Sequence, residues 1–523
     1  MTTSPSTGPT SAQQGKGVTP DTAAEPTTYD AKLARGRAAS RGPEPSPTPA
    51  PAVEPARAAT SSDPGDGGLR TSFAPTLLIA LAALAAIAPL AMDAYLPAFN
   101  QMAADLGISA STTQLTLTAF LVGVALGQLS IGVLSDRFGR RPLLLWGSVL
   151  AFVAGVGTAL APSAAVLLAA RFLQGLGGAA GMVLGRAVIS DRSRGITAAQ
   201  ALSLVMAIQG IAPVIAPILG GALVGPVGWR GILGVVAAFQ GILVLLVAAW
   251  VPETLPAEQR HEGGFGVLAQ GARELGKDHV FVRLIIINAL VYALLTSYLS
   301  AAPFMLQGVL GMSTAAYTAV FAVCGLVVTI TVAVCGSAAK RVSPERQIRL
   351  GLLAILVVDV VFAGVCFIWL SGPVASTPLT IATVALFIIH VMMLGTCMGN
   401  LPAVSLGRTG RWAGTGSALL GFIQFVCGGL ASPLVGLSGQ TSGVAFGVVI
   451  VVLAVTANVL AAFGVRDRGE KERLRAEAKA KRAARLGRDQ LPVPAVRNSA
   501  DVELAATGAA EAAAGRAEET DRA

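Results

Sequence analysis

Charged and aromatic side chains are scarce in this chain of 523 residues. Asp, Glu, Lys and Arg make up 13% of it and aromatic residues 5%, whereas hydrophobic residues make up 53%. The mean hydropathy of +0.67 lies well above the usual value for a soluble globular protein. The length alone would suggest several soluble domains, but this composition argues against them.

The residue patterns of metal sites, disulfide frameworks and hydrolytic enzymes are absent from the sequence. The five cysteines, none in a Cys-x-x-Cys pair, fall in long apolar runs, as expected of small packing residues. There is no His-Glu-x-x-His, no Gly-x-Ser-x-Gly and no acidic metal cluster. Residues 271–277 match most of a phosphate-binding loop, but Asp278 follows where Ser or Thr is needed. We therefore expect no enzyme, no metal, no organic cofactor and no ATP-driven activity.

Twelve apolar runs of about 20 residues dominate the chain, and each is long enough to cross the roughly 30 Å of a membrane's hydrocarbon as a helix. They lie near 74–97, 112–134, 143–161, 165–188, 199–223, 231–251, 284–306, 314–336, 348–370, 378–400, 413–437 and 443–464. The expected fold class is an all-α membrane protein with twelve transmembrane helices.

Lys and Arg fall mainly on one side of the predicted membrane. The connections on that side carry Arg137, Arg140, Arg141, Arg192, Arg194, Arg260, Arg273, Lys277, Lys340, Arg341, Arg346, Arg349, Arg408 and Arg411. The opposite connections offer only Arg230. Because positive charge accumulates on the cytoplasmic side, we expect both termini in the cytoplasm. The formal net charge of +9 mostly reflects this asymmetry and needs no nucleic-acid partner.

The runs divide into two sets of six, at residues 73–251 and 284–465, which a polar stretch at 252–283 separates. We expect this stretch to be a cytoplasmic central loop. Residues 1–72 are rich in Pro, Ser, Thr and Ala and lack the apolar content of a core, so we expect a disordered cytoplasmic tail. Residues 466–523 are expected to form a basic, partly helical or disordered tail. Its positive charge suits an anionic inner leaflet, with a merely solvated tail as the alternative.

A charged turn at residues 132–142, Gly-Val-Leu-Ser-Asp-Arg-Phe-Gly-Arg-Arg-Pro, joins the second and third runs. Its charged residues are Asp136, Arg137, Arg140 and Arg141. Hydrocarbon cannot hydrate these charges, so the turn must lie at a membrane face. Gly132 allows close approach of backbones, and Gly139 can adopt the positive φ of a tight reversal. The pattern Gly-x-x-x-Asp-Arg-x-Gly-Arg-Arg resembles the loop between helices 2 and 3 of the major facilitator superfamily.

Further motifs narrow this resemblance. The first run ends in Asp93-Ala-Tyr95-Leu-Pro, the fourth opens with Arg171-Phe-Leu-Gln174-Gly, and the seventh ends in Ala-Ala-Pro-Phe304. The fifth run carries the antiporter-motif residues Pro213, Pro217, Gly220 and Gly221. Two positions where that motif usually has glycine hold Ala212 and Ala216. Together these look like the bicyclomycin-resistance (Bcr/CflA) branch of the drug:proton antiporters. The resemblance implies two pseudo-symmetric six-helix halves that rock about a central site.

Proton coupling requires a carboxyl group that titrates in a cavity, and Asp93 is the strongest candidate. A lone ionised carboxylate in an apolar span costs at least about 2.5–3.5 kcal/mol. Arg171 is predicted to lie within about 3 Å of the same depth, at a rise of 1.5 Å per residue. Our hypothesis is that protonated Asp93 releases Arg171 or drug. A fixed ion pair that locks the first and fourth spans together is the alternative.

Other polar residues receive weaker assignments. The resemblance gives the charged turn a gating role, in addition to its anchoring at the membrane face. Asp359 is interpreted as facing a neighbouring helix, staying protonated or joining the coupling, and His390 as relaying protons or packing with one nitrogen satisfied. Candidates for the substrate cavity are Tyr95, Gln128, Gln174, Gln209, Phe304, Asn400 and Gln424. Several of these, together with Asn288, are equally able to bond across helices.

The function expected is proton-coupled export of drug-like small molecules from the cell membrane. A facilitator-type carrier of a physiological metabolite (a sugar, amino acid, peptide or siderophore) is the alternative. Sugar carriers of this superfamily usually hold more polar and aromatic side chains in their spans, whereas a greasy cavity suits lipophilic drugs. Besides substrate, protons and membrane lipid we expect no partner, and the chain is expected to be monomeric.

Overall fold

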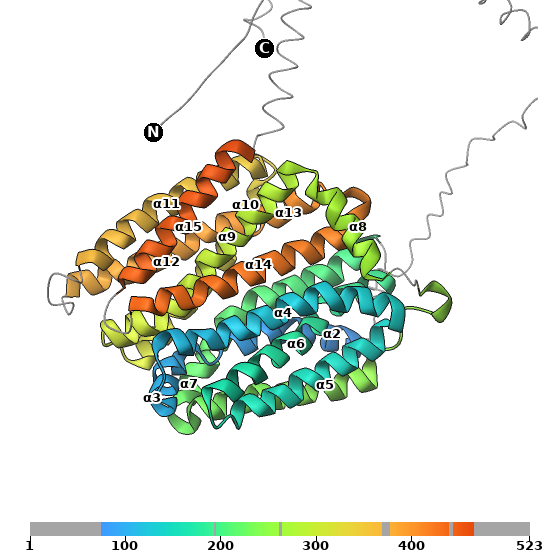
Figure 1. The fold of residues 1–523 in the computed structure, drawn as a ribbon, viewed down its shortest axis with the longest axis horizontal. Helices are drawn as coiled ribbons and strands as arrows, with labels where there is room; N and C mark the ends of the chain where they lie inside the picture. The colour runs from blue at the N-terminus through green and yellow to red at the C-terminus, as the bar shows by residue number, and fades with distance from the viewer. Residues whose placement is uncertain (1–74, 193–194, 261–263, 369–376, 439–442, 465–523) are drawn as a thin grey trace, which may run out of the picture. The chain divides into compact units, whose positions relative to one another are not determined.

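The computed structural model of the chain describes residues 75–192, 195–260, 264–368, 377–438 and 443–464. Within these ranges all regular structure is helical (Figure 1). The expectations for the tails at 1–72 and 466–523 lie outside the described residues. The all-α fold class predicted from the apolar runs is confirmed.

The N-terminal half carries six membrane crossings. Its elements are α2 (Pro75–Asp93), η1 (Leu96–Ala98), α3 (Phe99–Leu106), α4 (Ala110–Phe138), α5 (Arg140–Ala159), α6 (Ala164–Arg192) and α7 (Gly195–Trp250). The 56-residue α7 contains Gly228 at φ 66° and ψ −175°, which is not helical, so α7 is two helices that reverse at this glycine. Within the described residues, 11 helices are long and apolar enough to span a membrane. With α7 counted as two crossings, each of the twelve predicted runs has its helix.

The C-terminal half follows after a short connection with η2 (Ala257–Gln259). Its elements are α8 (Phe265–Gly276), α9 (His279–Ala302), η3 (Pro303–Val309), α10 (Thr314–Ala338), α11 (Pro344–Ile368), α12 (Thr377–Met398), α13 (Asn400–Leu406), η4 (Gly410–Trp412), α14 (Ala413–Val435), η5 (Gly436–Ser438) and α15 (Val444–Gly464). The stretch expected to be a loop therefore contains the helix α8. This helix forms because Leu275 packs into a small cluster with Phe281, Ile285 and Leu420.

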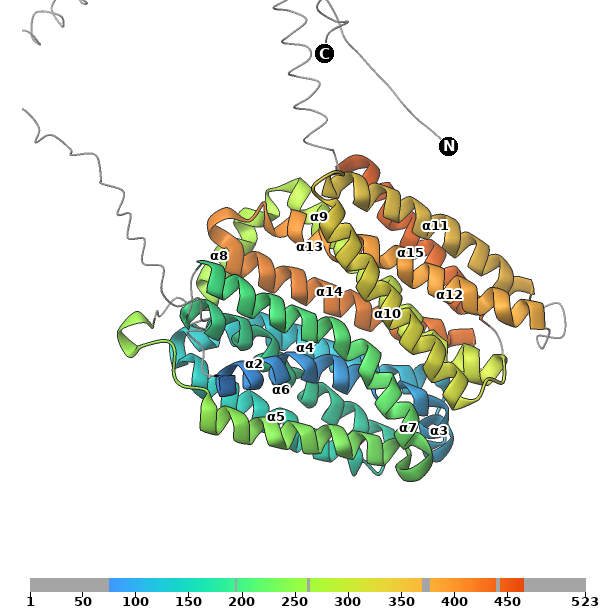
Figure 2. The same cartoon turned by 180° about the vertical axis from the view of Figure 1, so that it is seen from behind.

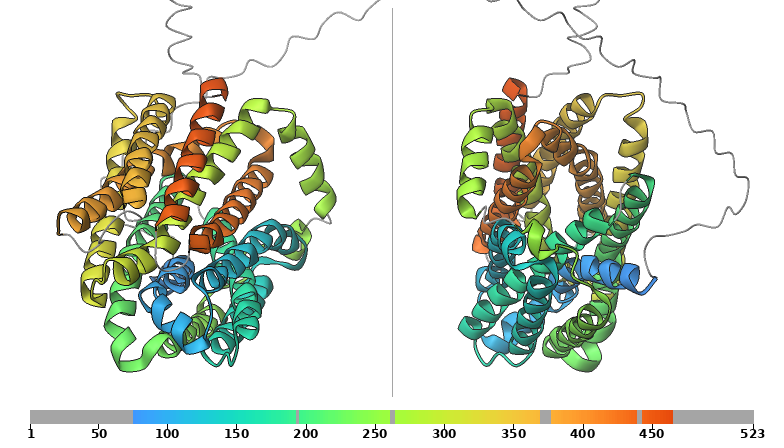
Figure 3. Two further views of the ribbon diagram at one scale, coloured as in Figure 1. Left: turned by 60° about the vertical axis from the view of Figure 1, so that its left-hand side comes forward. Right: turned by 90° about the vertical axis from the view of Figure 1, so that its right-hand side faces the viewer.

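The two sets of helices form two groups that meet along a long interface. Helices α2 to α7 lie in one group and α9 to α15 in the other, as Figures 1 and 2 show from opposite sides. The groups stay distinct in the turned views of Figure 3. Across the interface α4 packs against α14, and α7 packs against α10. These two helix pairs form most of the contact between the halves.

We call the end of the bundle that carries the charged turn the basic end, and the other end the opposite end. At the opposite end the first membrane helix of each half, α2 and α9, gives way to a short helix of another type, η1 and η3. Asn100 Nδ2 of α3 donates to the carbonyl oxygen of Pro303 at 3.3 Å. Gln307 Nε2 of η3 donates to the carbonyl oxygen of Pro97 at 3.3 Å. We call this pair the reciprocal amide bonds. Each half thus supplies a side-chain donor to a proline carbonyl of the other.

Helix α4 adds further bonds between the halves near the opposite end. Gln114 Nε2 donates to the carbonyl of Ser300 at 3.0 Å, and Thr118 Oγ1 donates to the carbonyl of Gly429 at 2.7 Å. Ser111 Oγ donates to the carbonyl of Pro433 at 3.2 Å. The carbonyl of Gly429 has no helical donor, because Pro433 four residues later lacks an N–H, and the Thr118 hydroxyl supplies one. These bonds hold the halves together at the opposite end.

Helix α7 approaches α2 too closely for any side chain at one position. A Cβ added to Gly220 would lie 1.7 Å from the carbonyl oxygen of Ala94, next to Asp93. A Cβ added to Gly221 would lie 2.2 Å from Thr318 Oγ1 on α10, in the other half. The two motif glycines therefore place α7 directly against both α2 and α10.

We predict that Gly220→Ala lowers the free energy of unfolding by about 1–3 kcal/mol, the usual cost of overpacking, since backbone must move to admit the methyl group. Gly225→Ala on the same helix is the matched control, because no atom lies within 4 Å of its added Cβ. Thermal unfolding of both purified variants in detergent checks the prediction. Equal melting temperatures of the two variants would contradict it.

Candidate functional site

A cavity of about 470 Å³ lies between the halves at the basic end. Helices α4 and α6 form one wall and α8 and α14 the other. Its charged lining residues are Asp136, Arg140, Arg186 and Arg411. Most of the remaining wall is small or apolar, including Leu129, Val133, Val183 and Val267. This space is large enough for a small organic molecule.

The charged turn borders this cavity and is centred on Arg140. Gly139 has φ 98°, the positive value that the tight reversal was expected to need. Arg140 Nη1 donates to Asp136 Oδ1 at 2.7 Å, and its Nε donates to Asp191 Oδ2 at 3.3 Å. The Arg140 side chain thus connects the last turns of α4 and α6, at the mouth of the cavity.

Glu253, just after α7, completes this network by capping α5. Its Oε1 accepts hydrogen bonds from the backbone N–H groups of Arg140 at 2.9 Å, Thr254 at 2.9 Å and Leu255 at 3.0 Å. Burial raises the pKa of the Glu253 carboxyl, but backbone hydrogen bonds from Leu255, Arg140, Thr254 and Arg141 outweigh burial and hold this pKa below its ordinary value. Glu253 is therefore a carboxylate fixed at a helix N-terminus, where the helix dipole favours negative charge.

The remaining residues of the charged turn are less involved. Arg141 Nη2 donates to the carbonyl of Ala248 at 2.7 Å, near the end of α7. The Arg137 guanidinium lies 5.4 Å from the centre of the Phe138 ring. The close backbone approach expected at Gly132 is absent, because an added Cβ would meet only Val183 Cγ1 at 3.8 Å. Gly132 nevertheless lines the cavity.

Asp93 lies at the last residue of α2 and is 1% exposed. Its Oδ1 atom is buried and accepts no hydrogen bond. Three tyrosines of the C-terminal half, Tyr292, Tyr298 and Tyr317, lie within electrostatic range of its carboxyl group. Asp93 therefore lies towards the interface between the halves, and Gly220 packs against the backbone of the next residue, Ala94.

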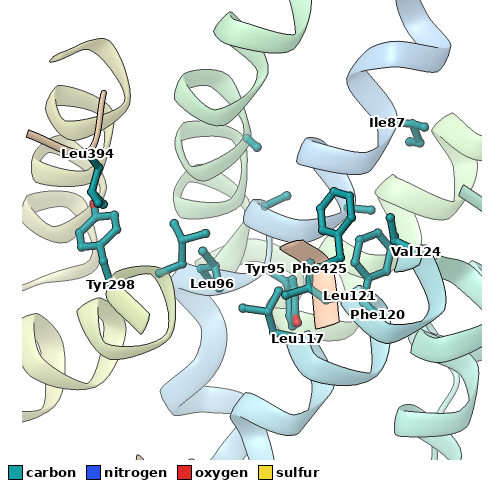
Figure 4. Close-up of a cluster of buried hydrophobic side chains, with 14 of the residues drawn as sticks. Ile87, Tyr95, Leu96, Leu117, Phe120, Leu121, Val124, Tyr298, Leu394 and Phe425 are labelled. Carbon is teal, nitrogen blue, oxygen red and sulfur yellow. The ribbon is translucent and has the colours of Figure 1, made fainter. Parts of the chain in front are cut away.

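Arg171 is completely buried in α6 and has partners of a different kind. Its Nη1 donates to Gln174 Oε1 at 2.7 Å and to the carbonyl of Ala91 at 3.1 Å. Its guanidinium lies 4.4 Å from the centre of the Tyr95 ring and 4.5 Å from that of Phe120. Figure 4 shows these two rings within the buried cluster that also includes Leu117, Leu121 and Phe425.

Asp93 and Arg171 are thus neighbours that do not pair. Arg171 reaches α2 at Ala91, two residues before Asp93, as the predicted depths require. Among the described ion pairs of the chain, none joins the two side chains. In this conformation the first and fourth spans are held by the bond between Arg171 and a backbone carbonyl, and no fixed ion pair joins them.

The predicted cavity residues separate into lining and bridging positions. Gln128 lines the cavity, and its Oε1 would lie 2.4 Å from a Cβ added to Gly421 of the other half. Gln174 Nε2 bonds Gln240 Oε1 at 3.1 Å, and Gln424 Oε1 accepts from Asn288 Nδ2 at 2.9 Å.

The other four candidates also lie outside the cavity lining. Asn400 Nδ2 donates to Gln347 Oε1 at 3.1 Å, within the C-terminal half. The Tyr95 hydroxyl lies 3.0 Å from Thr116 Oγ1. Phe304 packs on Phe99 with ring centres 5.9 Å apart, and Gln209 is half-buried on α7. Most of these polar residues therefore bond across helices, the alternative that the sequence left open.

The antiporter-motif prolines lie in the interior of α7. The Pro213 carbonyl would be 3.5 Å from a Cβ added to Gly325 of α10, and Pro217 follows one turn later. The two alanines that replace motif glycines, Ala212 and Ala216, are both buried. The motif as a whole lies where α7 contacts both α2 and α10.

A buried Asp–His pair escaped the sequence reasoning. Asp359 of α11 and His390 of α12 contact each other through Oδ1 and Nδ1 at 2.5 Å. From the sequence, Asp359 and His390 receive separate interpretations. Because an isolated charged group in a membrane span costs free energy, each of the two is expected to have a polar partner. The occurrence of both in consecutive spans was the signal that could have joined them.

Comparison with known proteins places these features in a family context. The family model described as Major Facilitator Superfamily matches residues 81–433. An uncharacterized MFS-type transporter, YdgK of Bacillus subtilis (strain 168), is 34% identical over 391 residues, which cover 74% of this chain and 95% of YdgK. A bicyclomycin resistance protein homolog of Haemophilus influenzae is 27% identical over 361 residues, covering 68% of this chain and 88% of its own length.

Solved structures agree on the fold. The crystal structure of a bacterial homolog of the human lysosomal transporter Spinster, in an inward-facing and unoccupied conformation, superposes with a TM-score of 0.63. The two chains are 18% identical, and the match covers 76% of this chain and 98% of the other. At this identity the likeness concerns the fold alone.

The cap on α5 generates a pH-dependent prediction. A carboxylate whose pKa folding lowers stabilises the fold above its unfolded value, and this contribution is lost as the pH falls through the folded pKa. We expect Glu253→Gln to lower stability at pH 7 by about 0.5–1 kcal/mol. The difference from wild type should shrink below the ordinary pKa of 4.5. Thermal unfolding across pH checks this, with exposed Glu258→Gln as the control. An effect of Glu253→Gln that is equal at pH 7 and pH 4 would contradict it.

Proposed function

The chain belongs to the Major Facilitator Superfamily, and on that premise we propose that it is a proton-coupled exporter of drug-like small molecules. Export would proceed by alternating access, as the two halves rock about a central site. The observation that carries the proposal is Asp93, a buried acid with an unpartnered oxygen that faces the interface between the halves. Such a group in a membrane span is a functional candidate by default, because its charge is expensive there.

The arrangement of the halves supports one state of such a cycle. The opposite end is joined by the reciprocal amide bonds and by the bonds of α4. The basic end has the 470 Å³ cavity between the same halves. With the basic end assigned to the cytoplasm by the positive-inside rule, this is an inward-facing conformation of a cell-membrane protein with both termini cytoplasmic.

Asp93 and Arg171 have separate roles in the proposed coupling. Arg171, bonded to Ala91 and Gln174, holds the backbone of α2 just before Asp93. In the absence of substrate Asp93 is protonated, in the interface between the halves and outside the lining of the described cavity. A drug that enters from the cytoplasm displaces the proton, and the opposite state takes up a new one. Coupling then follows because drug and proton compete for one site.

The charged turn acts as the gate latch at the cytoplasmic end. In this conformation the Arg140 side chain borders the cavity, and its hydrogen-bond partners among the described residues, Asp136, Asp191 and Ser135, all belong to the N-terminal half. Closing the cavity brings α8 and α14 toward this network. The latch therefore rearranges when the halves rock.

The substrate class rests on the relatives and on the cavity wall. One relative is by name a bicyclomycin resistance protein homolog. The cavity wall is largely apolar, and such walls bind by buried area with few hydrogen bonds. Carriage of a sugar, amino acid, peptide or siderophore is the competing function. Besides substrate, protons and lipid no partner is needed, and we propose a monomer.

We predict that Asp93→Asn abolishes drug-induced proton efflux. Everted membrane vesicles with an acidic interior and a fluorescent pH probe would receive bicyclomycin, chloramphenicol or a lipophilic cation. Wild type should show proton efflux on addition of a transported drug, and Asp93→Asn should fall to the level of vesicles without the protein. The matched control is Asp105→Asn, an exposed acid of α3 that accepts a bond from Trp229 Nε1 at 2.9 Å.

Each result decides between hypotheses. An equal response of wild type and Asp93→Asn at matched expression would remove Asp93 from the coupling. No response of wild type to any of these drugs, with the protein present, would favour the metabolite carrier.

A further inference from the structure

Among the described ion pairs, the Asp359–His390 pair has the two most deeply buried side chains. Both side chains are 0% exposed, and Oδ1 and Nδ1 lie 2.5 Å apart. Asp359 lies in the middle of α11, and His390 in the middle of α12. The pair thus sits at membrane depth in the C-terminal half, whereas Asp93 lies in the N-terminal half.

The surroundings of the pair are aromatic. Phe362, Phe387 and Phe446 contact one another with ring centres 4.8–5.8 Å apart, and Tyr298 packs on Phe387 at 5.4 Å. The titratable groups at membrane depth on the elements around the pair are Tyr292 and Tyr298 on α9, Tyr317, Cys324 and Cys335 on α10, Cys366 on α11 and Cys397 on α12. The charged and imidazole groups of these elements lie at the basic end, namely His279 and Arg283 on α9 and Glu345, Arg346 and Arg349 on α11. Among the described residues of these elements, no charge beside the pair therefore balances a net charge of the pair.

This environment selects the number of protons that the pair holds. A carboxylate beside a neutral imidazole has a net charge of −1 among the phenylalanines. One added proton, on either the carboxylate or the imidazole, makes the pair neutral overall. Two added protons, one on each group, give a net charge of +1. Because an uncompensated buried charge is costly, the one-proton state is the one that fits this conformation.

Two atoms of the pair remain available for proton exchange. Asp359 Oδ2 and His390 Nε2 are buried and have no hydrogen-bond partner. A pair that served only to join α11 to α12 would need just the contact between Oδ1 and Nδ1, which two groups that cannot ionise could also make. The unpartnered Oδ2 and Nε2 atoms can take up or release a proton when water reaches them, while the contact between Oδ1 and Nδ1 persists.

Tyr298 relates the pair to the central site. Its ring centre lies 6.5 Å from that of His390, and its hydroxyl is buried beside the Cys324 thiol. Tyr298 is also one of the tyrosines that lie within electrostatic range of Asp93. In Figure 4 its hydroxyl points toward Leu394, one turn beyond His390 on α12. Tyr298 is therefore a neighbour of the pair that also lies near Asp93.

We propose that Asp359 and His390 form a second proton-binding site, which loads and releases one proton in the same cycle as Asp93. The step is the transfer of a proton from the neutral pair to water, which leaves a carboxylate and a neutral imidazole, followed by reloading from the other side. The inference rests on the proposed function and adds to it that two protons are exchanged for each exported molecule. Asp93 supplies coupling in the N-terminal half, and the pair supplies it in the C-terminal half.

The stoichiometry of purified protein in proteoliposomes tests this. Radiolabelled bicyclomycin is allowed to reach its steady gradient at imposed pH differences, with the membrane potential clamped to zero. For an uncharged drug each exchanged proton contributes the tenfold ratio of one pH unit, so wild type should concentrate it about 100-fold per unit. The double variant Asp359→Asn/His390→Gln should concentrate it about 10-fold. Thr383→Val, a buried hydroxyl of α12 that bonds within its own helix, is the control and should match wild type.

The outcomes separate the two proposals. A wild-type gradient of about 10-fold per pH unit overturns the second site by itself, whether or not the double variant folds, and leaves the proposed function standing. A 100-fold gradient that the double variant retains also overturns it. A wild-type protein that builds no gradient with bicyclomycin, or with the other drugs of the vesicle experiment, removes the proposed function and with it the second site.

Discussion

A polar group inside a membrane must find its partner within the protein, because hydrocarbon offers no water. In this chain the carbonyls of Pro97 and Pro303, just beyond the first helix of each half, accept side-chain amide donors from the other half, Gln307 and Asn100. These bonds join the halves at the opposite end, whereas a cavity separates the halves at the basic end.

The same constraint explains why two neighbouring buried charges behave differently. Arg171 has a backbone carbonyl, a glutamine and two aromatic faces as partners of its permanent charge, while its Nε and Nη2 atoms make no hydrogen bond among the described residues. Asp93 has an oxygen with no donor. A guanidinium keeps its proton and must always be accommodated, whereas a carboxyl group becomes neutral by accepting one. Arg171 therefore keeps its charge throughout, whereas Asp93 can gain or lose its charge by releasing or binding a proton.

The sequence predicted what depends on hydrophobic length and on turn chemistry. The twelve apolar runs predicted the twelve membrane crossings. Gly139 and the charged residues beside it predicted the tight turn between α4 and α5. Contacts between distant segments were harder, because period and composition say nothing of which helix lies beside which. The partner of Asp359 is 31 residues away on another helix. The helix α8 was missed since its stability comes from packing against α9 and α14, not from its own polar composition.

The reciprocal amide bonds have a kinetic meaning as well as a structural one. Each bond joins a residue of one half to the bend of the other, so a rigid-body rotation that stretches one stretches its twin. If the halves move as rigid bodies, one of the reciprocal amide bonds cannot open while the other stays closed, since both join the same two halves. The opposite end therefore behaves as a binary switch. A carrier sealed in this way exposes its site to one compartment at a time, so protons cannot flow through it as they would through an open channel.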